Sequence, residues 1–78
     1  MDNLQKYNNA FVVIFSIEEE QLNGLKYQAI KVWDSVGHMQ LIAEIEDIFD
    51  IMFDTDDIID FSSYEMGKEI LKKYEVII

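Results

Sequence analysis

The sequence predicts an all-α protein, a small four-helix bundle with three main helices, one short helix and a long loop after the first helix. Apolar residues recur at helical spacing in two long stretches, helix-capping patterns precede several segments, and the chain contains no proline. Its 78 residues are enough for one domain, expected over residues 1–78. Hydrophobic residues make up 50% of the chain, which excludes a disordered acidic tail.

The first helix is predicted over residues 3–15 by a set of apolar residues at helical spacing: Leu4, Tyr7, Phe11, Ile14 and Phe15. The segment from Ser16 to Glu19 has the form of a capping box, so a short helical turn is expected to follow. Gly24, after an asparagine, ends that turn. Residues 24–33 show no regular period, and we expect a loop that large side chains hold on the core: Leu25, Tyr27, Ile30, Val32 and Trp33.

The second helix is predicted over residues 35–50, behind a cap at Asp34-Ser35. One stripe at helical spacing marks its buried side: His38, Leu41, Ile42, Ile45 and Phe49. The opposite side combines apolar and polar residues: Val36, Met39, Gln40, Ala43, Asp47 and Asp50, with Glu46 at its edge. Apolar spots rimmed by carboxylates are typical of a contact surface, although scattered apolar surface residues are also ordinary.

The remaining elements are shorter. Residues 56–61 form a short helix at best, and a second capping box, Ser62 to Glu65, starts a last helix over residues 64–74. Gly67 inside that helix costs about 1 kcal/mol relative to alanine. Three lysines lie near its C-terminal end, where the helix dipole favours cations: Lys68, Lys72 and Lys73.

Charge is the strongest compositional signal. Sixteen Asp and Glu residues against six lysines give a formal net charge of −10. Between Val32 and Gly67 there is no lysine but there are ten carboxylates, eight of them from Glu44 to Asp60. Such a block produces a focused negative field that suits rapid, reversible docking onto a basic patch of a partner protein. It also excludes most nucleic-acid binding and disfavours an anionic membrane surface.

Other classes of function are also excluded or disfavoured. Without cysteine and with one histidine, the chain has no disulfide scaffold, no thiolate zinc site and no His-rich metal site, so no metal is expected. The longest apolar run, residues 11–15, is far too short to insert into a membrane. The N-terminus has no basic region of a secretory signal. We therefore expect a cytoplasmic monomer.

Enzymatic interpretations fail on geometry, and we expect no enzyme. Asp34, Ser35 and His38 have the residue types of a hydrolase triad, but neighbours on one helical turn cannot supply base, orienting group and oxyanion hole from separate directions. His38 is instead expected at the edge of the core. A calcium loop beginning at Asp54 would place isoleucines at its fifth and sixth positions, where an oxygen ligand and glycine are needed.

The stretch from Trp33 to Ile42, Trp-Asp-Ser-Val-Gly-His-Met-Gln-Leu-Ile, resembles the attachment motif of acyl carrier proteins. That family has Asp-Ser-Leu followed by an amphipathic acidic helix, and Val36 stands here in place of the usual leucine. The resemblance covers essentially the whole chain, including the long loop and the closing helix. Gly67 and the apolar Ile48 depart from the family pattern.

The resemblance implies a four-helix bundle that carries a 4′-phosphopantetheine arm on Ser35, with Asp34 as the neighbouring motif residue. The arm, taken from coenzyme A, would hold acyl or aminoacyl groups as thioesters. A phosphopantetheinyl transferase and enzymes that load or use these groups would be the partners, docking through basic patches. The recognition residues assigned on the second helix are Val36, Met39, Ala43, Glu46 and Asp47.

This motif resembles that of stand-alone carriers in specialised pathways more closely than that of the housekeeping fatty-acid carrier. The acyl group and the pathway stay open, as does whether the arm folds back into the bundle. The alternative function is an unmodified acidic helical adaptor, or an inhibitor, that binds a basic protein. Intact mass after incubation with coenzyme A and a broad-specificity transferase separates the two.

Overall fold

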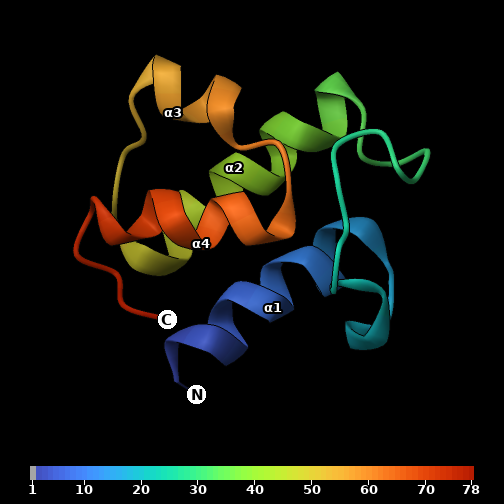
Figure 1. Ribbon diagram of the computed structural model, residues 1–78, viewed down its shortest axis with the longest axis horizontal. Helices are drawn as coiled ribbons and strands as arrows, with labels where there is room; N and C mark the ends of the chain where they lie inside the picture. The colour runs from blue at the N-terminus through green and yellow to red at the C-terminus, as the bar shows by residue number, and fades with distance from the viewer. Residues whose placement is uncertain (1) are drawn as a thin grey trace.

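The computed structural model describes residues 2–78, so residue 1 of the expected domain lies outside the described residues. The predicted all-α class is confirmed, with three main helices and one short one. A single turn of 3₁₀ helix, η1, follows the first helix (Figure 1). The elements in chain order are α1 (Asn3–Phe15), η1 (Glu19–Gln21), α2 (Ser35–Phe49), α3 (Thr55–Asp60) and α4 (Tyr64–Lys72).

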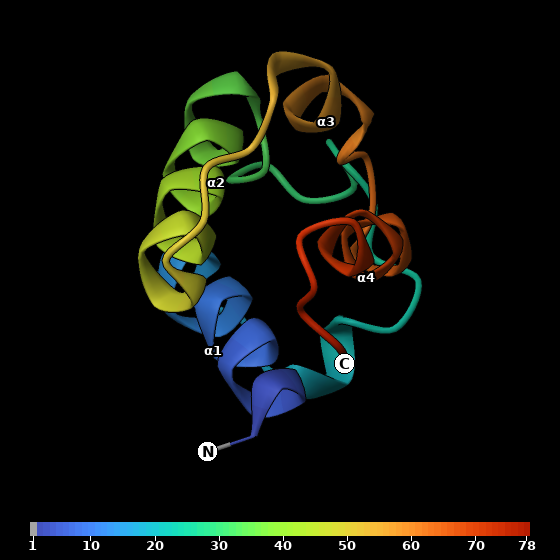
Figure 2. The ribbon, with the colours of Figure 1, turned by 90° about the vertical axis from the view of Figure 1, so that its left-hand side faces the viewer.

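The helices enclose one apolar core. α1 and α2 pack on one side of the bundle, and α3 and α4 lie on the other (Figure 2). The centre of the core is rich in aromatic rings, which meet edge to face or tilted: Tyr7, Phe11, Phe15, Trp33, Phe61 and Tyr64. Such ring pairs add to the stabilisation that apolar burial provides. No helix within residues 2–78 has the length and apolar character needed to cross a membrane.

α1 has the bounds that its apolar spacing predicted. Asp2 caps it with a capping box, because its Oδ1 accepts a hydrogen bond from the Gln5 N–H at 2.8 Å and the Gln5 side chain accepts from the Asp2 N–H. Ser16 ends the helix in the left-handed conformation, with φ 54°. The capping box expected at Ser16 therefore begins two residues later, at Glu18, whose N–H donates to Gln21 at 3.0 Å.

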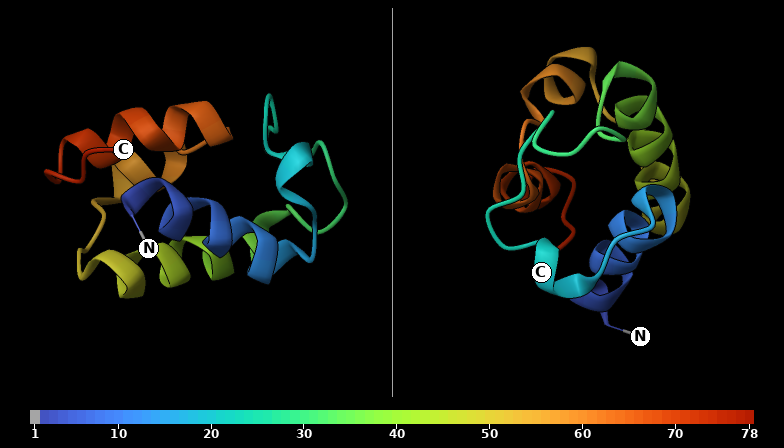
Figure 3. Two further views of the ribbon diagram at one scale, coloured as in Figure 1. Left: turned by 90° about the horizontal axis from the view of Figure 1, so that it is seen from below. Right: turned by 90° about the vertical axis from the view of Figure 1, so that its right-hand side faces the viewer.

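The loop between η1 and α2 is anchored by only some of its large side chains. Leu25 and Trp33 are buried, whereas Tyr27 and Val32 are more than a third exposed, contrary to the expectation that all of them face the core. The loop runs beside the start of α4 before it reaches the head of α2 (Figure 3). Backbone hydrogen bonds join it to that region, from Tyr64 N to Leu25 O and from Tyr27 N to Ser62 O, each 2.9 Å.

α2 buries most of the side that its spacing predicted. Leu41, Ile42 and Ile45 are fully enclosed. The prediction that Phe49 belongs to the buried side is wrong, because Phe49 is only partly buried at the edge of the core. The helix also ends at Phe49 rather than at residue 50, since Asp50 adopts the left-handed conformation with φ 53° and caps the last turn.

Two glycines are required by close packing. A Cβ atom on Gly37 would clash with the carbonyl oxygen of Val32, and one on Gly67 would clash with the Tyr7 hydroxyl and the Phe61 ring. From the sequence, Gly67 was expected only to weaken its helix. In the structure, the missing side chain also lets α4 approach the aromatic core.

The last two helices differ slightly from their predicted ranges. α3 begins at Thr55 and is six residues long. α4 begins as predicted, with Ser63 Oγ accepting from the Met66 N–H at 3.0 Å, but ends at Lys72 rather than at residue 74. The chain then turns back, and the side-chain amide of Asn3 donates to the Ile77 carbonyl at 3.1 Å, so the two ends of the chain lie together.

Candidate functional site

Ser35 is the first residue of α2 and is exposed to solvent. Asp34 fixes this helix end, because its Oδ1 accepts from the Gly37 N–H at 2.9 Å and its carbonyl accepts from the His38 N–H at 2.7 Å. Within residues 2–78, the N–H groups of Ser35 and Val36 make no hydrogen bond. The serine hydroxyl thus lies beside free N–H donors at the positive end of a helix dipole.

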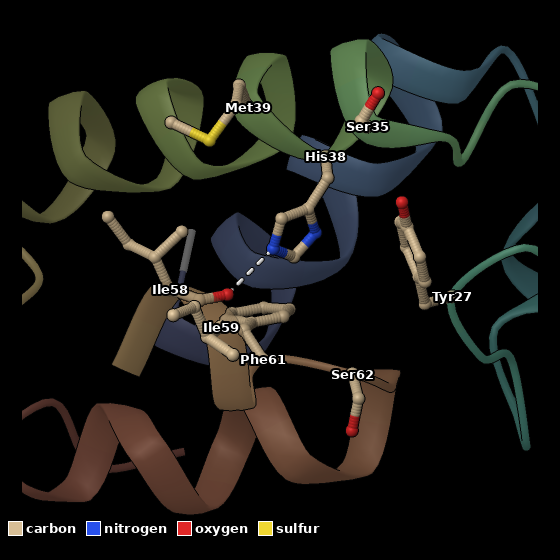
Figure 4. Close-up of a pocket in the computed structure, with 8 residues that line it drawn as sticks. All are labelled: Tyr27, Ser35, His38, Met39, Ile58, Ile59, Phe61 and Ser62. Carbon is tan, nitrogen blue, oxygen red and sulfur yellow. Dashed lines mark hydrogen bonds between the residues drawn. The ribbon is translucent and has the colours of Figure 1, made fainter. Parts of the chain in front are cut away.

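A cleft of about 360 Å³ opens beside Ser35, between α2, α3 and the preceding loop (Figure 4). Its walls are mainly apolar, with Ser35 at one edge. The lining residues come from all three segments and from the start of the α3–α4 connection: Tyr27, Ser35, His38, Met39, Ile58, Ile59, Phe61 and Ser62.

His38 forms the floor of this cleft and is half-buried, as its predicted place at the core edge requires. Its Nδ1 accepts from the Trp33 indole N–H at 3.0 Å, so Nε2 carries the ring proton and donates to the Ile58 carbonyl at 2.8 Å (Figure 4). Both ring nitrogens are occupied within the fold. His38 therefore has a structural role: its hydrogen bonds join α2 to the preceding loop and to α3. It is not placed to act as a general base for Ser35.

Tyr27 closes the cleft from the loop. Its ring centroid lies 5.5 Å from the His38 ring and 6.4 Å from the Trp33 ring, both edge to face. Figure 4 shows its hydroxyl on the side of the cleft where Ser35 lies. Sequence reasoning placed Tyr27 in the core and missed the cleft, because a loop without periodicity gives no sign of which side chains remain outside.

The other missed residues belong to α3 and its end. Ile58 is half-buried, while Ile59 is 71% exposed. Two adjacent isoleucines in a short acidic helix cannot both face the core, and that pair was a usable sign of an exposed apolar spot. Ile59 and Met39 lie on opposite sides of the cleft mouth (Figure 4).

The surface residues assigned to partner recognition are mostly exposed. Val36 is 66% exposed and Met39 is 52% exposed, and Ala43 and Asp47 also face solvent. Glu46 departs from the prediction, because it is half-buried and its Oε2 accepts from the Phe53 N–H at 2.9 Å. Its carboxylate is thus held by the turn after α2 and is not a free surface charge.

The acidic block keeps its charge in the fold. On α4, Lys68 and Lys72 pair with carboxylates one turn away, and Lys73 pairs with Asp57 at 2.8 Å. Within residues 2–78, Asp57 is the one carboxylate of the Glu44–Asp60 stretch that has a lysine partner. α2 and α3 therefore carry largely unneutralised carboxylates.

Asp57 has a structural role that the sequence did not reveal. Its carboxylate is buried and accepts from Lys73 Nζ at 2.8 Å and from the Tyr74 hydroxyl at 2.6 Å. The hydrogen bond from Lys73, followed by that from Tyr74, lowers the pKa of Asp57. The Tyr74 hydroxyl also accepts from the Asp54 N–H at 2.9 Å, so the chain after α4 holds the start of α3.

Within residues 2–78, no group of three or more His, Asp or Glu side chains is arranged so that it could hold a metal ion. Comparison of the chain with protein-family models, curated proteins and solved structures finds no match. The exposed serine, the cleft beside it and the surrounding charge are therefore the features from which function is inferred.

Proposed function

We propose that the protein is an acyl carrier protein, which holds acyl or aminoacyl groups as thioesters on a 4′-phosphopantetheine arm attached to Ser35. The observation that carries the proposal is the exposed Ser35 at the head of an acidic helix, within the Asp-Ser motif of an all-α bundle. The chain has no cysteine, so the arm supplies the thiol that forms the thioester.

The residues around Ser35 fit a phosphodiester. The free N–H groups of Ser35 and Val36 and the N-terminal end of the helix dipole favour a negatively charged group on the serine oxygen. Gly37, tight against the Val32 carbonyl, keeps the loop packed on this helix end. The protein's own contribution is thus to present the serine and to hold its surroundings rigid.

The surface around Ser35 fits brief docking of several enzymes. Exposed Val36, Met39 and Ile59 offer apolar contact, and Ala43 leaves the helix surface open. Asp47, together with the other unpaired carboxylates, attracts basic patches and raises association rates more than affinity. The partners are a phosphopantetheinyl transferase and the enzymes that load or use the acyl group.

In this proposal the protein is a monomeric cytoplasmic carrier and not an enzyme. His38 does not serve Ser35 as a base in this proposal, because both of its ring nitrogens are hydrogen-bonded, one to Trp33 and the other to Ile58. Chemistry on the thioester then belongs to the partner enzymes, and the carrier supplies binding, presentation and release.

Intact mass spectrometry tests the proposal. Wild-type protein incubated with coenzyme A and a broad-specificity phosphopantetheinyl transferase is expected to gain the mass of one arm, and Ser35→Ala to gain none. Circular dichroism of the alanine variant controls for folding. A wild type that never gains the arm would favour the unmodified acidic adaptor instead.

A further inference from the structure

We infer that His38 is a pH-sensitive lock on the loop that leads to Ser35. The neutral ring accepts a hydrogen bond from Trp33 and thereby holds this loop, whereas the protonated ring has no lone pair to offer. The inference goes beyond the proposed function and does not depend on it, because it concerns the unmodified chain.

Only the neutral ring of His38 makes both of its contacts. Nδ1 accepts from the Trp33 indole N–H at 3.0 Å, and Nε2 donates to the Ile58 carbonyl at 2.8 Å. A protonated ring carries hydrogen on both nitrogens, so two donors would face each other at Trp33. The bond to Ile58 would persist and strengthen, since its donor becomes charged. Protonation therefore breaks the link to the loop and keeps the link to α3.

The Trp33 indole has no substitute acceptor. Within residues 2–78, His38 is the one hydrogen-bond partner of its N–H. The Trp33 side chain is fully buried, with its ring packed on Phe11 and Phe15 of α1, so solvent does not reach it in this fold. A buried donor without an acceptor is costly. Protonation of His38 therefore favours separation of the two rings.

The loop before α2 depends on Trp33 for its shape. The Trp33 carbonyl accepts from the Gln28 N–H at 3.0 Å, and the Trp33 N–H donates to the Ile30 carbonyl at 3.1 Å. Asp34, which caps α2, and Ser35 follow directly. Loss of the indole hydrogen bond is therefore expected to loosen the segment that leads to Ser35.

The surroundings of the His38 ring leave its own proton as the group that titrates near neutral pH. Histidine ordinarily gains a proton between about pH 5 and pH 8. Tyr27, Trp33 and Phe61 pack on the ring, and phenols are neutral over that range. Within residues 2–78, no carboxylate forms an ion pair with the ring. The charged side chains of the adjoining segments are exposed Lys26 and Lys31 in the loop, Asp34 bonded to the Gly37 N–H, exposed Asp56 and Asp60 on α3, and Asp57 bonded to Lys73.

Nitrogen-15 NMR of the unmodified protein tests the inference directly, because the chain has one histidine and one tryptophan. At pH 8 the ring should show the tautomer that carries its proton on Nε2. From pH 8 to pH 5.5, the indole N–H resonance should shift along the same titration curve as the ring. The protection of that N–H from exchange should fall about twofold to tenfold, as loss of one hydrogen bond predicts.

Three outcomes of this titration overturn the inference. One is a ring with its proton on Nδ1 at pH 8. Another is a ring that is still neutral at pH 5.5. The third is an indole N–H whose resonance and protection stay unchanged while the ring titrates.

His38→Gln is the matched variant, because glutamine forms hydrogen bonds but does not titrate. Urea denaturation of both proteins over the same pH range measures their difference in stability, and the titration of carboxylates common to both cancels in that difference. The excess of the wild-type folding equilibrium constant over that of the variant should shrink about twofold to tenfold towards pH 5.5, since protonation favours states without the Trp33 bond. An excess that stays constant with pH contradicts the lock. If the variant does not fold, the wild-type titration alone decides.

Discussion

Gly67 shows at the scale of one residue how packing reverses an intrinsic preference. In an exposed helix, alanine is more stable than glycine by about 1 kcal/mol. Here an added Cβ would clash with the Tyr7 hydroxyl and the Phe61 ring. The Tyr7 hydroxyl is itself committed, because it donates to the Tyr64 carbonyl at 2.7 Å, and burial raises its pKa far above the ordinary value.

Gly67→Ala is therefore expected to destabilise the fold by about 1–3 kcal/mol, the usual cost of overpacking a core. Urea denaturation followed by circular dichroism measures the change. The exposed neighbour provides the control, since Met66→Ala should fall within about ±0.5 kcal/mol. A Gly67→Ala variant that is more stable than wild type would mean that α4 does not lie this close to Tyr7.

At the scale of an element, α2 has a buried face and an exposed face, and the proposed function assigns recognition to the exposed one. Leu41 is fully buried, so Leu41→Ala should cost about 2–5 kcal/mol. Val36 is mostly exposed, so Val36→Ser should change stability by no more than about 0.5 kcal/mol. Because Val36 flanks Ser35, the proposed attachment site, the same change should slow modification by the transferase.

Thermal melts and transferase kinetics on both variants check this division of α2. The rates are compared per folded molecule, which removes any effect of unfolding. A Val36→Ser variant that unfolds while its folded fraction is modified at the wild-type rate would place Val36 in the core and refute the assigned docking face.

α3 is too short to be stable alone, and the contacts of Asp57 fix its position. The lowered pKa of Asp57 means that its contribution to stability is present above about pH 4, the range of an unfolded aspartate, and is lost as pH falls through the folded value. The hydrogen bond to Asp57 raises the pKa of Lys73, and partial burial raises the pKa of Tyr74. Their contributions are present below about pH 10 and are lost as pH rises through the folded values.

Asp57→Asn should therefore be less stable than wild type at pH 7 and should lose less additional stability on acidification to pH 2. Chemical denaturation at a series of pH values measures both effects. Asp56→Asn, at an exposed neighbouring site, is the matched control and should keep the acid sensitivity of wild type. An Asp57→Asn variant with that same sensitivity would contradict the anchoring role of Asp57.

These elements differ in how far the sequence predicts them. α1 and α2 were predicted to within a residue, because apolar spacing and the caps at Asp2 and Asp34 are local features. The cleft was not predicted. Its walls depend on contacts between distant residues, such as the His38 ring with the Ile58 carbonyl and Asp57 with Lys73, and no local pattern encodes them.

At the scale of the whole molecule, charge opposes the fold. The formal net charge is −10, and ten carboxylates lie between Val32 and Gly67 without a lysine, while Lys68, Lys72 and Lys73 are paired. Mutual repulsion of the carboxylates destabilises the compact state. The same carboxylates produce the negative field that is proposed to attract basic partners. One set of charges therefore affects both stability and the proposed docking.

Raising the salt concentration from 10 mM to 150 mM shortens the Debye length from about 30 Å to about 8 Å and should raise the melting temperature. Each kcal/mol of repulsion removed corresponds to roughly 4–8 °C for a domain of this size. Calorimetry at constant pH and constant buffer concentration measures this shift in melting temperature. A melting temperature indifferent to salt would show that the carboxylates do not strain the fold.

The location of the arm tests the central claim most directly. Ser62 lines the same cleft as Ser35, so it is the natural competitor for modification. Fragment mass spectrometry of the transferase product should place the added mass on Ser35, and Ser62→Ala should be modified as wild type is. An arm on Ser62, or no arm on either serine, would contradict the account of this protein as a carrier that uses the head of α2.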